Sequence, residues 1–439
     1  MGNKEFVISL FNLLNENYNY AVLRSFEELP ENFISHDVDI LIDKKEFNLL
    51  KKDVCKIIKY FDYRLLMVNT NERFVTFIIA KQIGDELIYL YLDFFFNYSL
   101  YGVNLIDAHE VLEKRQFNGK VYHVNKVYEF LEKFLNTSLL NQGYPSKYSE
   151  LLNEINENYS LEVNSRLSAL FNIKALNIVD CEKNSGNYLL KKAFLRNLFS
   201  NPIKQVAFST KFLCYHLKGK LKPNGFSFSI TGPDGSGKTT ILNGLEDKFS
   251  KVYREVEYNH FRPTVIPRIA ELFKESGLKK DVDVNYDKPH RGEKTGILSS
   301  VFRIFYYIAD YIIGYYKLVK PILVRRGVVI FDRYFTDIIS DSKRSQINLN
   351  YKVLFFLRRL VPKMNYNFII FVEPKIILER KKELTKIQIE DIYVKLNYIC
   401  NKDNNYTPIE NNKNVEVAIN EIINFVLSNQ NKKYNKFFK

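Results

Sequence analysis

The segment Gly232–Thr240 constrains the fold more than any other part of the chain, because it has the spacing Gly-x-x-x-x-Gly-Lys-Ser/Thr. The apolar run Phe226–Thr231 precedes it and predicts a buried parallel strand, and Ile241–Phe249 follows with helical spacing. Glycines let the backbone curl so that successive N–H groups point at one centre, and the helix N-terminus adds positive partial charge. We therefore predict a strand, a phosphate-binding loop and a helix in a parallel α/β sheet.

Each residue type in this loop has an expected role in binding ATP and Mg²⁺. Lys238 should neutralise the β- and γ-phosphates, and the Thr239 hydroxyl should ligate Mg²⁺. The alternative is a chance match in a glycine-rich loop. The predicted nucleotide-binding residues are Gly232, Asp234, Gly235, Ser236, Gly237, Lys238, Thr239 and Thr240.

A second buried strand is predicted at Gly327–Phe331, and it is followed directly by Asp332-Arg333-Tyr334. Ligands of open α/β sheets gather beyond the carboxyl ends of the strands, so Asp332 and Arg333 should face the phosphate-binding loop. Asp332 would hold Mg²⁺ through water or orient an attacking hydroxyl, and Arg333 would clamp an acceptor phosphate. A strand-end salt bridge is the structural alternative.

The residues from about Phe226 to Leu427 resemble the thymidylate kinase family of nucleoside monophosphate kinases. The resemblance rests on motifs in the family's order: the loop with its acidic Asp234, Phe261-Arg262-Pro263 after the strand Val256–Asn259, Asp332-Arg333-Tyr334, the strand Phe368–Val372 with the helix Pro374–Arg380, and Ile409-Glu410-Asn411-Asn412. It implies a P-loop kinase fold that uses ATP and Mg²⁺.

The resemblance also implies roles for individual residues. Asp234, Arg262 and Arg333 would bind the acceptor, the two arginines through its phosphate. Arg380, with Lys381 and Lys382, would close over the transferring phosphoryl group, although such a run is also typical of a solvated helix face. The predicted catalytic residues are Lys238, Asp332, Arg333 and Arg380, and the predicted Mg²⁺ ligands are Thr239 and Asp332.

Two differences from the family leave more than one class of acceptor to consider. Ala309-Asp310-Tyr311 has Tyr where the family has an Arg that supports thymidine monophosphate binding, and Arg303 is a candidate substitute. The segment Glu275–Ser299, with His290 and Arg291, is longer than in the family. A nucleoside monophosphate is the first expectation for the acceptor, and a sugar or a cell-envelope precursor is the alternative.

The N-terminal part carries three carboxylates on predicted strands: Asp37 and Asp39 before an apolar run, and Asp93 inside another. Residues i and i+2 of a strand share a face, so these carboxylates could hold divalent cations. Residues 1–125 thereby resemble the α+β nucleotidyltransferase fold of the DNA polymerase β superfamily, with Arg24-Ser25 in place of the family's Gly-Ser. A turn-forming Asp-x-Asp and a strand-edge Asp93 are the structural alternatives.

The chain has 439 residues and a formal net charge of +14, so more than one domain is expected. We predict a nucleotidyltransferase-like domain at 1–125, a helical connector at 126–222 and a P-loop kinase domain at 223–439. Tyr188–Leu221 is basic and amphipathic, which predicts connecting helices or, as the lesser alternative, a membrane-surface element. The four cysteines of the chain are far apart in sequence, which indicates neither a zinc knuckle nor a CxxC redox site.

We therefore predict an ATP-dependent phosphotransferase with a small-molecule phosphate acceptor. The alternatives are an ATP-binding regulatory protein and an active nucleotidyltransferase. A homodimer is compatible with the resemblance, and the scattered lysines do not indicate nucleic acid binding. The polar N-terminus predicts no secretory signal and hence a cytoplasmic protein. Leu87–Ile106 and Phe302–Tyr316 contain Asp93 and Asp310, so we expect buried soluble elements and no transmembrane segment.

Overall fold

The computed structural model describes residues 2–140, 146–174, 176, 184–266, 296–342, 344–381 and 383–438. Two compact units are defined by packing. The first unit consists of Met1–Ile83, Leu87–Leu221 and Leu427–Lys439, and the second of Gly84–Glu86 and Lys222–Val426. These units reflect packing alone, and the three domains expected from the sequence stay a prediction.

The first unit is built on a mixed sheet. Its strands are β1 (Tyr20–Val22), β2 (Asp37–Ile42), β3 (Arg64–Thr70), β4 (Phe74–Ile83), β5 (Glu86–Phe95), β6 (Asn97–Leu100), β7 (Val103–Asp107), β8 (Gln116–Phe117) and β9 (Tyr122–His123). Within the described residues, seven of them form one sheet in the order β3-β4-β5-β2-β1-β9-β8. β2 and β5 run parallel with Asp39 opposite Asp93, so two of the three predicted carboxylates lie on neighbouring strands.

The helices of the first unit are α1 (Asn3–Asn17), α2 (Lys44–Tyr60), α3 (Ala108–Leu112), α4 (Lys126–Leu139), α5 (Ser146–Phe171), α7 (Gly186–Ser200) and α8 (Pro202–Leu221). α2 shows how the sequence specifies them. The Asp43 carboxylate caps its first turn by accepting from the Lys45 N–H at 2.7 Å. Phe47, Leu50 and Val54 are spaced three or four residues apart, so they share one face of the helix. This face is buried and packs on the sheet.

The second unit contains a wholly parallel sheet, as the phosphate-binding motif predicts. Its strands are β10 (Phe226–Thr231), β11 (Val256–His260), β12 (Val328–Asp332), β13 (Tyr366–Phe371) and β14 (Tyr406–Glu410), in the order β11-β12-β10-β13-β14 among the described residues. Every residue of β10 and β12 is buried, as expected for central strands covered on both faces. This arrangement is consistent with a P-loop kinase fold.

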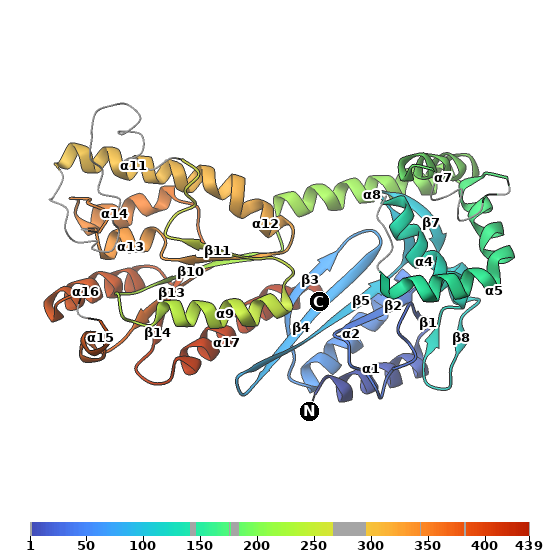
Figure 1. Ribbon diagram of the computed structural model, residues 1–439, viewed down its shortest axis with the longest axis horizontal. Coiled ribbons are helices and arrows are strands. Elements are labelled where there is room, and N and C mark those ends of the chain that lie inside the picture. Colours follow the sequence, from blue (N-terminus) through green and yellow to red (C-terminus); the bar gives the residue numbers. More distant parts are fainter. Residues whose placement is uncertain are drawn as a thin grey trace. The chain divides into compact units, whose positions relative to one another are not determined.

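Helices cover both faces of this sheet, with α9 and α11 on opposite sides (Figure 1). The helices are α9 (Lys238–Val252), α11 (Ile297–Gly314), α12 (Lys320–Val324), α13 (Phe335–Ser340), α14 (Tyr351–Leu357), α15 (Pro374–Arg380), α16 (Lys386–Lys402) and α17 (Val415–Tyr434). Tyr315–Val319 forms a π-helical segment between α11 and α12, and the short 3₁₀ helices are Arg358–Leu360 and Asn435–Phe438. The part of α17 from Leu427 onward and the helix Asn435–Phe438 belong to the first unit.

The prediction that Phe302–Tyr316 is a buried element is corrected by the structure. Asp310 is fully buried, but Phe302 is 62% exposed and Tyr316 60% exposed. The reason is that this helix carries apolar side chains on all of its faces, whereas only one face packs against the sheet. Within the described part of the chain, Ile297–Val324 alone has the length and composition to cross a membrane, which by itself is weak evidence for a membrane span.

Candidate active site

The phosphate-binding loop and the predicted acidic strand end lie at the same edge of the parallel sheet. Ile230 of β10 pairs with Asp332 of β12, which in turn pairs with His260 of β11. The loop between β10 and α9 needs its glycines. Gly237 has φ +85°, and a Cβ atom there would lie 2.6 Å from Asn411 Nδ2, so a larger residue would strain and crowd the loop.

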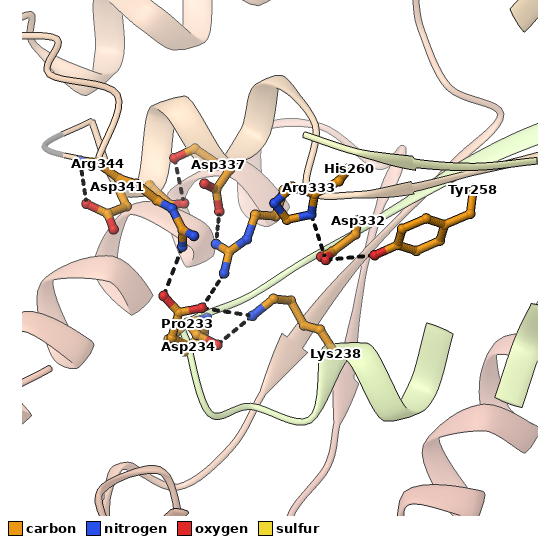
Figure 2. Close-up of polar contacts among 11 residues, drawn as sticks. Pro233, Asp234, Lys238, Tyr258, His260, Asp332, Arg333, Asp337, Asp341 and Arg344 are labelled. Atoms are coloured by element: carbon orange, nitrogen blue, oxygen red, sulfur yellow. Dashed lines mark hydrogen bonds and ion pairs between the residues drawn. The ribbon is translucent and has the colours of Figure 1, made fainter. Parts of the chain in front are cut away.

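Lys238 is buried at the start of α9 and points back into the loop (Figure 2). Its Nζ donates to the Pro233 carbonyl oxygen at 2.7 Å and lies 4.0 Å from Asp234 Oδ1. Burial and the nearby Arg333 guanidinium lower the pKa of Lys238 to about 7. Because a polyphosphate would favour the charged ammonium, this geometry suits a group that neutralises bound phosphate.

Asp234 is held by two arginines from outside the loop (Figure 2). Arg333 Nη2 donates to Asp234 Oδ1, and Arg344 Nη1 donates to Asp234 Oδ2 at 2.9 Å. Burial opposes the ionisation of Asp234, but Arg333, Lys238 and Arg344 outweigh it and lower its pKa to about 2. Asp234 is therefore a fixed negative charge that orients the cations around the loop.

Arg333 joins this network to α13. Its Nη1 donates to Asp337 Oδ1 at 2.6 Å, and its side chain is buried. The backbone of Arg333 is left-handed, with φ +67°, a conformation that costs a non-glycine residue of the order of 1 kcal/mol. Strain of this kind persists only where surrounding contacts hold the residue, and here two carboxylates do so.

Asp332 ends β12 beside Lys238 and has two partners from β11 (Figure 2). The Tyr258 hydroxyl donates to Asp332 Oδ2 at 3.1 Å, and His260 Nδ1 lies 3.1 Å from the same oxygen. Burial opposes ionisation, but the hydrogen bond from His260 and the charge of Arg333 lower the pKa of Asp332. Asp332 is thus an ionised carboxylate at the strand end, where a Mg²⁺ ligand was predicted.

Arg262, predicted to grip the acceptor, is held in place by Asp310. The Arg262 Nη1 to Asp310 Oδ2 distance is 3.0 Å, and the guanidinium lies over the ring of Tyr307. Tyr311, which stands where the family has Arg, is buried, and its hydroxyl donates to the Phe261 carbonyl at 2.9 Å. Asp310 and Tyr311 therefore both fix the segment that carries Arg262.

Arg303, the candidate substitute for the missing family arginine, has different partners. Its Nη1 donates to the Ser345 carbonyl at 3.4 Å and to Gln346 Oε1 at 3.0 Å. These contacts tie α11 to the loop after α13. These contacts do not include Asp310, which lies seven residues after Arg303 on the same helix.

The predicted lid begins next to the phosphate-binding loop. Arg380 ends α15 and is exposed, with its Nη1 3.8 Å from the position that a Cβ on Gly237 would take. Lys381 is also exposed and pairs with Glu383 at 3.1 Å. Lys382 and the part of the Glu275–Ser299 segment that holds His290 and Arg291 lie outside the described residues.

The polar groups of this site fit a phosphate ligand and Mg²⁺. Thr239 is exposed at the mouth of the loop, and Asn411 Nδ2 donates to the Ser236 carbonyl at 2.9 Å. Buried polar side-chain atoms usually have partners, and those that lack one need an explanation. Among the described residues, the buried side-chain atoms here without a protein partner include Thr231 Oγ1, Ser236 Oγ, Asp332 Oδ1, Arg333 Nε, Asp337 Oδ2 and Asn411 Oδ1.

The three N-terminal carboxylates, Asp37, Asp39 and Asp93, lie on the neighbouring strands β2 and β5. Arg24 Nε donates to Asp39 Oδ2 at 2.5 Å. Burial, and secondarily the charge of Asp39, raises the pKa of Asp93 to about 7. In the described part of the chain, no group of three or more His, Cys, Asp or Glu side chains has a geometry that would hold a metal ion. A metal role for Asp37, Asp39 and Asp93 stays a prediction.

Sequence reasoning missed Asp337 and Arg344, and also the Tyr258 hydroxyl that donates to Asp332. Asp337 lies on α13, four residues after Arg333, and this short separation was the available signal. Arg344 reaches Asp234 from a loop, and no spacing in the sequence indicates that contact.

The comparisons with known proteins found similarity to thymidylate kinases over part of the chain. No family model matches the chain. A probable thymidylate kinase of Pyrobaculum aerophilum is 31% identical over 150 residues, which are 34% of this chain and 65% of that kinase. The match therefore spans slightly less than two thirds of the length of that relative. The solved thymidylate kinase of Ehrlichia chaffeensis is 20% identical, with 46% of this chain and 100% of that chain covered and a TM-score of 0.31.

Proposed function

We propose that the second unit is an ATP-dependent phosphotransferase that moves the γ-phosphoryl group of ATP to a small acceptor. One observation carries the proposal. The loop with Lys238 and the ionised Asp332 meet at the carboxyl edge of one parallel sheet, and Arg333 links that edge to the loop. A site that only bound nucleotide would not need the further cations that surround this edge.

In the proposed reaction an acceptor oxygen bonds to the γ-phosphorus, the bond from that phosphorus to the β–γ bridging oxygen breaks, and ADP leaves. Thr239 and Asp332 would hold Mg²⁺, which supplies charge neutralisation at the phosphate oxygens when bound. The backbone N–H groups of the loop bind phosphate oxygens. Lys238 and Arg380 stabilise the negative charge that spreads over the equatorial oxygens in the transition state.

A nucleoside monophosphate is the acceptor that we propose first. The relative from Pyrobaculum aerophilum is named a probable thymidylate kinase, which supports this class. Arg262, held by Asp310, supplies a rigid guanidinium that suits bidentate phosphate binding. Tyr311 replaces the family's arginine, so a sugar phosphate or an envelope precursor is the second class to test.

The test is turnover of ATP by the full chain against a panel of nucleoside monophosphates and sugar phosphates, with Lys238→Ala as the central variant. Removal of one preorganised transition-state contact lowers turnover by about 100- to 1,000-fold. Lys251→Ala is the matched control, because Lys251 lies on the same helix and pairs with Asp247 at 2.7 Å. Its turnover should equal that of the parent.

Two outcomes would contradict the proposal. Equal turnover and equal ATP affinity in Lys238→Ala would remove the loop from the chemistry. Tight ATP binding without consumption for any acceptor would favour a regulatory ATP-binding protein instead.

A further inference from the structure

Helix α8 has two faces with different surroundings. On one face Gln205 is buried and its Nε2 donates to the Gly102 carbonyl at 2.8 Å, and the Phe212 ring packs on Tyr101 and Gly102. This face anchors the helix to the first unit. The other face is exposed, although it is apolar: Ile203 83%, Val206 54%, Leu213 55%, Leu217 50% and Leu221 78%, with Cys214 exposed among them.

These apolar side chains lie on one side of the helix, with Thr210 between Val206 and Leu213. Ile203, Val206, Leu213, Leu217 and Leu221 recur at intervals that return to the same side of a helix of 3.6 residues per turn. Exposed apolar residues scattered singly need no explanation, but a stripe along a 20-residue helix marks a surface that binds something apolar.

The charges beside this stripe have one sign. Between Asn184 and Lys222 the sequence has seven Lys, one Arg and no Asp or Glu. Lys204, Lys211 and Lys218 recur every seven residues and so line one border of the stripe, and Lys220 lies on the other border. Lys204 also reaches Asp107 at 2.7 Å, whereas the other three point to no described partner.

We propose that α8 docks the protein on the surface of an anionic lipid bilayer. The apolar stripe enters the boundary between headgroups and acyl chains, and the bordering lysines reach the lipid phosphates while their methylene stems stay in the apolar layer. A nucleic acid would use the lysines and leave the stripe exposed. A partner protein would bury the stripe but would not require so uniform a charge. The bilayer alone uses both features.

The experiment is co-sedimentation of the full chain with vesicles of phosphatidylcholine that contain phosphatidylserine, and with vesicles of phosphatidylcholine alone. We expect binding to the anionic vesicles and release by high salt, since screening weakens attraction between exposed charges. The variant with Lys211→Gln, Lys218→Gln and Lys220→Gln should bind about 100-fold more weakly, at about fivefold for each lysine. Leu213→Ser and Leu217→Ser should each weaken binding about tenfold.

Matched controls separate this surface from general charge and hydrophobicity. Lys4→Gln, Lys45→Gln and Lys52→Gln together remove the same charge from exposed positions elsewhere in the first unit. Leu161→Ser removes an apolar side chain that is 87% exposed. Both controls should bind the vesicles like the parent. Unchanged thermal unfolding and ATP turnover should show that all variants are folded.

A second measurement follows the exposed face directly. With Cys55, Cys181 and Cys400 replaced by Ser, an environment-sensitive fluorophore on Cys214 should shift to shorter wavelength when anionic vesicles are added. The proposal is overturned if the protein binds neither kind of vesicle, or if the control variants lose binding equally. It is also overturned if the lysine variant loses only binding to single-stranded nucleic acid, or if Leu213→Ser abolishes a dimer in a protein that binds no vesicles.

Discussion

Two groups of carboxylates, one in each unit, have the same side-chain chemistry but opposite electrostatics. In the second unit Asp234 is surrounded by Arg333, Lys238 and Arg344, and its pKa falls to about 2. In the first unit Asp93 lies opposite Asp39 in the sheet, and its pKa rises to about 7.

The difference shows that the number of cations within reach, and not burial by itself, sets the direction of a pKa shift. Burial opposes ionisation of both carboxylates, but the ion pairs of Asp234 outweigh it. In the first unit Arg24 pairs with Asp39 at 2.5 Å, and the buried Oδ1 of Asp93 has no hydrogen-bond partner among the described residues. The charge of Asp234 is compensated by cations of the protein itself, whereas burial and the charge of Asp39 favour the protonated form of Asp93.

The largest expected effect is a loss of folding free energy in Arg333→Ala, which removes the ion pairs of Arg333 with Asp234 and Asp337. Removing one partner of a buried ion pair leaves uncompensated charge, which costs about 3–5 kcal/mol of folding free energy. Native-state hydrogen exchange of β12 and α13 in the full chain measures this loss. Arg344→Ala is the control, since Arg344 is 26% exposed and its pair should contribute about 1 kcal/mol or less. Equal protection in Arg333→Ala and the parent would show that Asp234 and Asp337 do not depend on Arg333.

The second prediction concerns the pH dependence of folding stability in Asp93→Asn, in the first unit. The pKa of Asp93 is about 7 in the folded state against an ordinary value of 3.8, so the folded state binds more protons and stability falls as pH rises from about 4 to 7. Asp93→Asn removes this penalty, and it should stabilise β2 and β5 by up to about 4 kcal/mol at pH 8 and have little effect at pH 4.

Hydrogen exchange of the β2 and β5 peptides at both pH values measures this difference. Asp53→Asn is the control, because the hydrogen bond from Lys56 lowers the pKa of Asp53 and its replacement should not stabilise the protein at pH 8. A loss of protection in Asp93→Asn at pH 8 would mean that the ionised carboxylate stabilises the sheet.

The smallest expected effect is a change in the Mn²⁺ affinity of the N-terminal carboxylates. Arg24→Ala leaves Asp39 without its ion pair, so the affinity of the N-terminal carboxylates for Mn²⁺ should rise by about fivefold. Titration of the full chain with Mn²⁺, followed by electron paramagnetic resonance in the absence of nucleotide, measures this affinity. The double variant Arg24→Ala/Asp93→Asn should lose the gain. Unchanged Mn²⁺ binding in Arg24→Ala would argue for a structural role of these carboxylates.

Much of the second unit was predictable because its signals are local. The loop motif, the apolar strands and the rule that ligands gather at the carboxyl ends of parallel strands together placed Lys238, Asp332 and Arg333 at one edge. The burial of Phe302–Tyr316 was predicted wrongly, since an apolar helix does not reveal how many of its faces find a partner. The contact from Arg344 to Asp234 joins residues 110 positions apart, beyond the reach of any local pattern.

By itself, the sequence determined the backbone conformations: glycines where the loop needs φ above zero, apolar runs in β10 and β12, and a basic α8 without acidic residues. The tertiary structure alone decided which charges are compensated. It brought Arg344 to Asp234 and placed β5 beside β2, so that Asp39 and Asp93 face each other. The physical reason is range. Backbone preferences act over a few residues, whereas an ion pair forms only between groups that packing brings within about 4 Å.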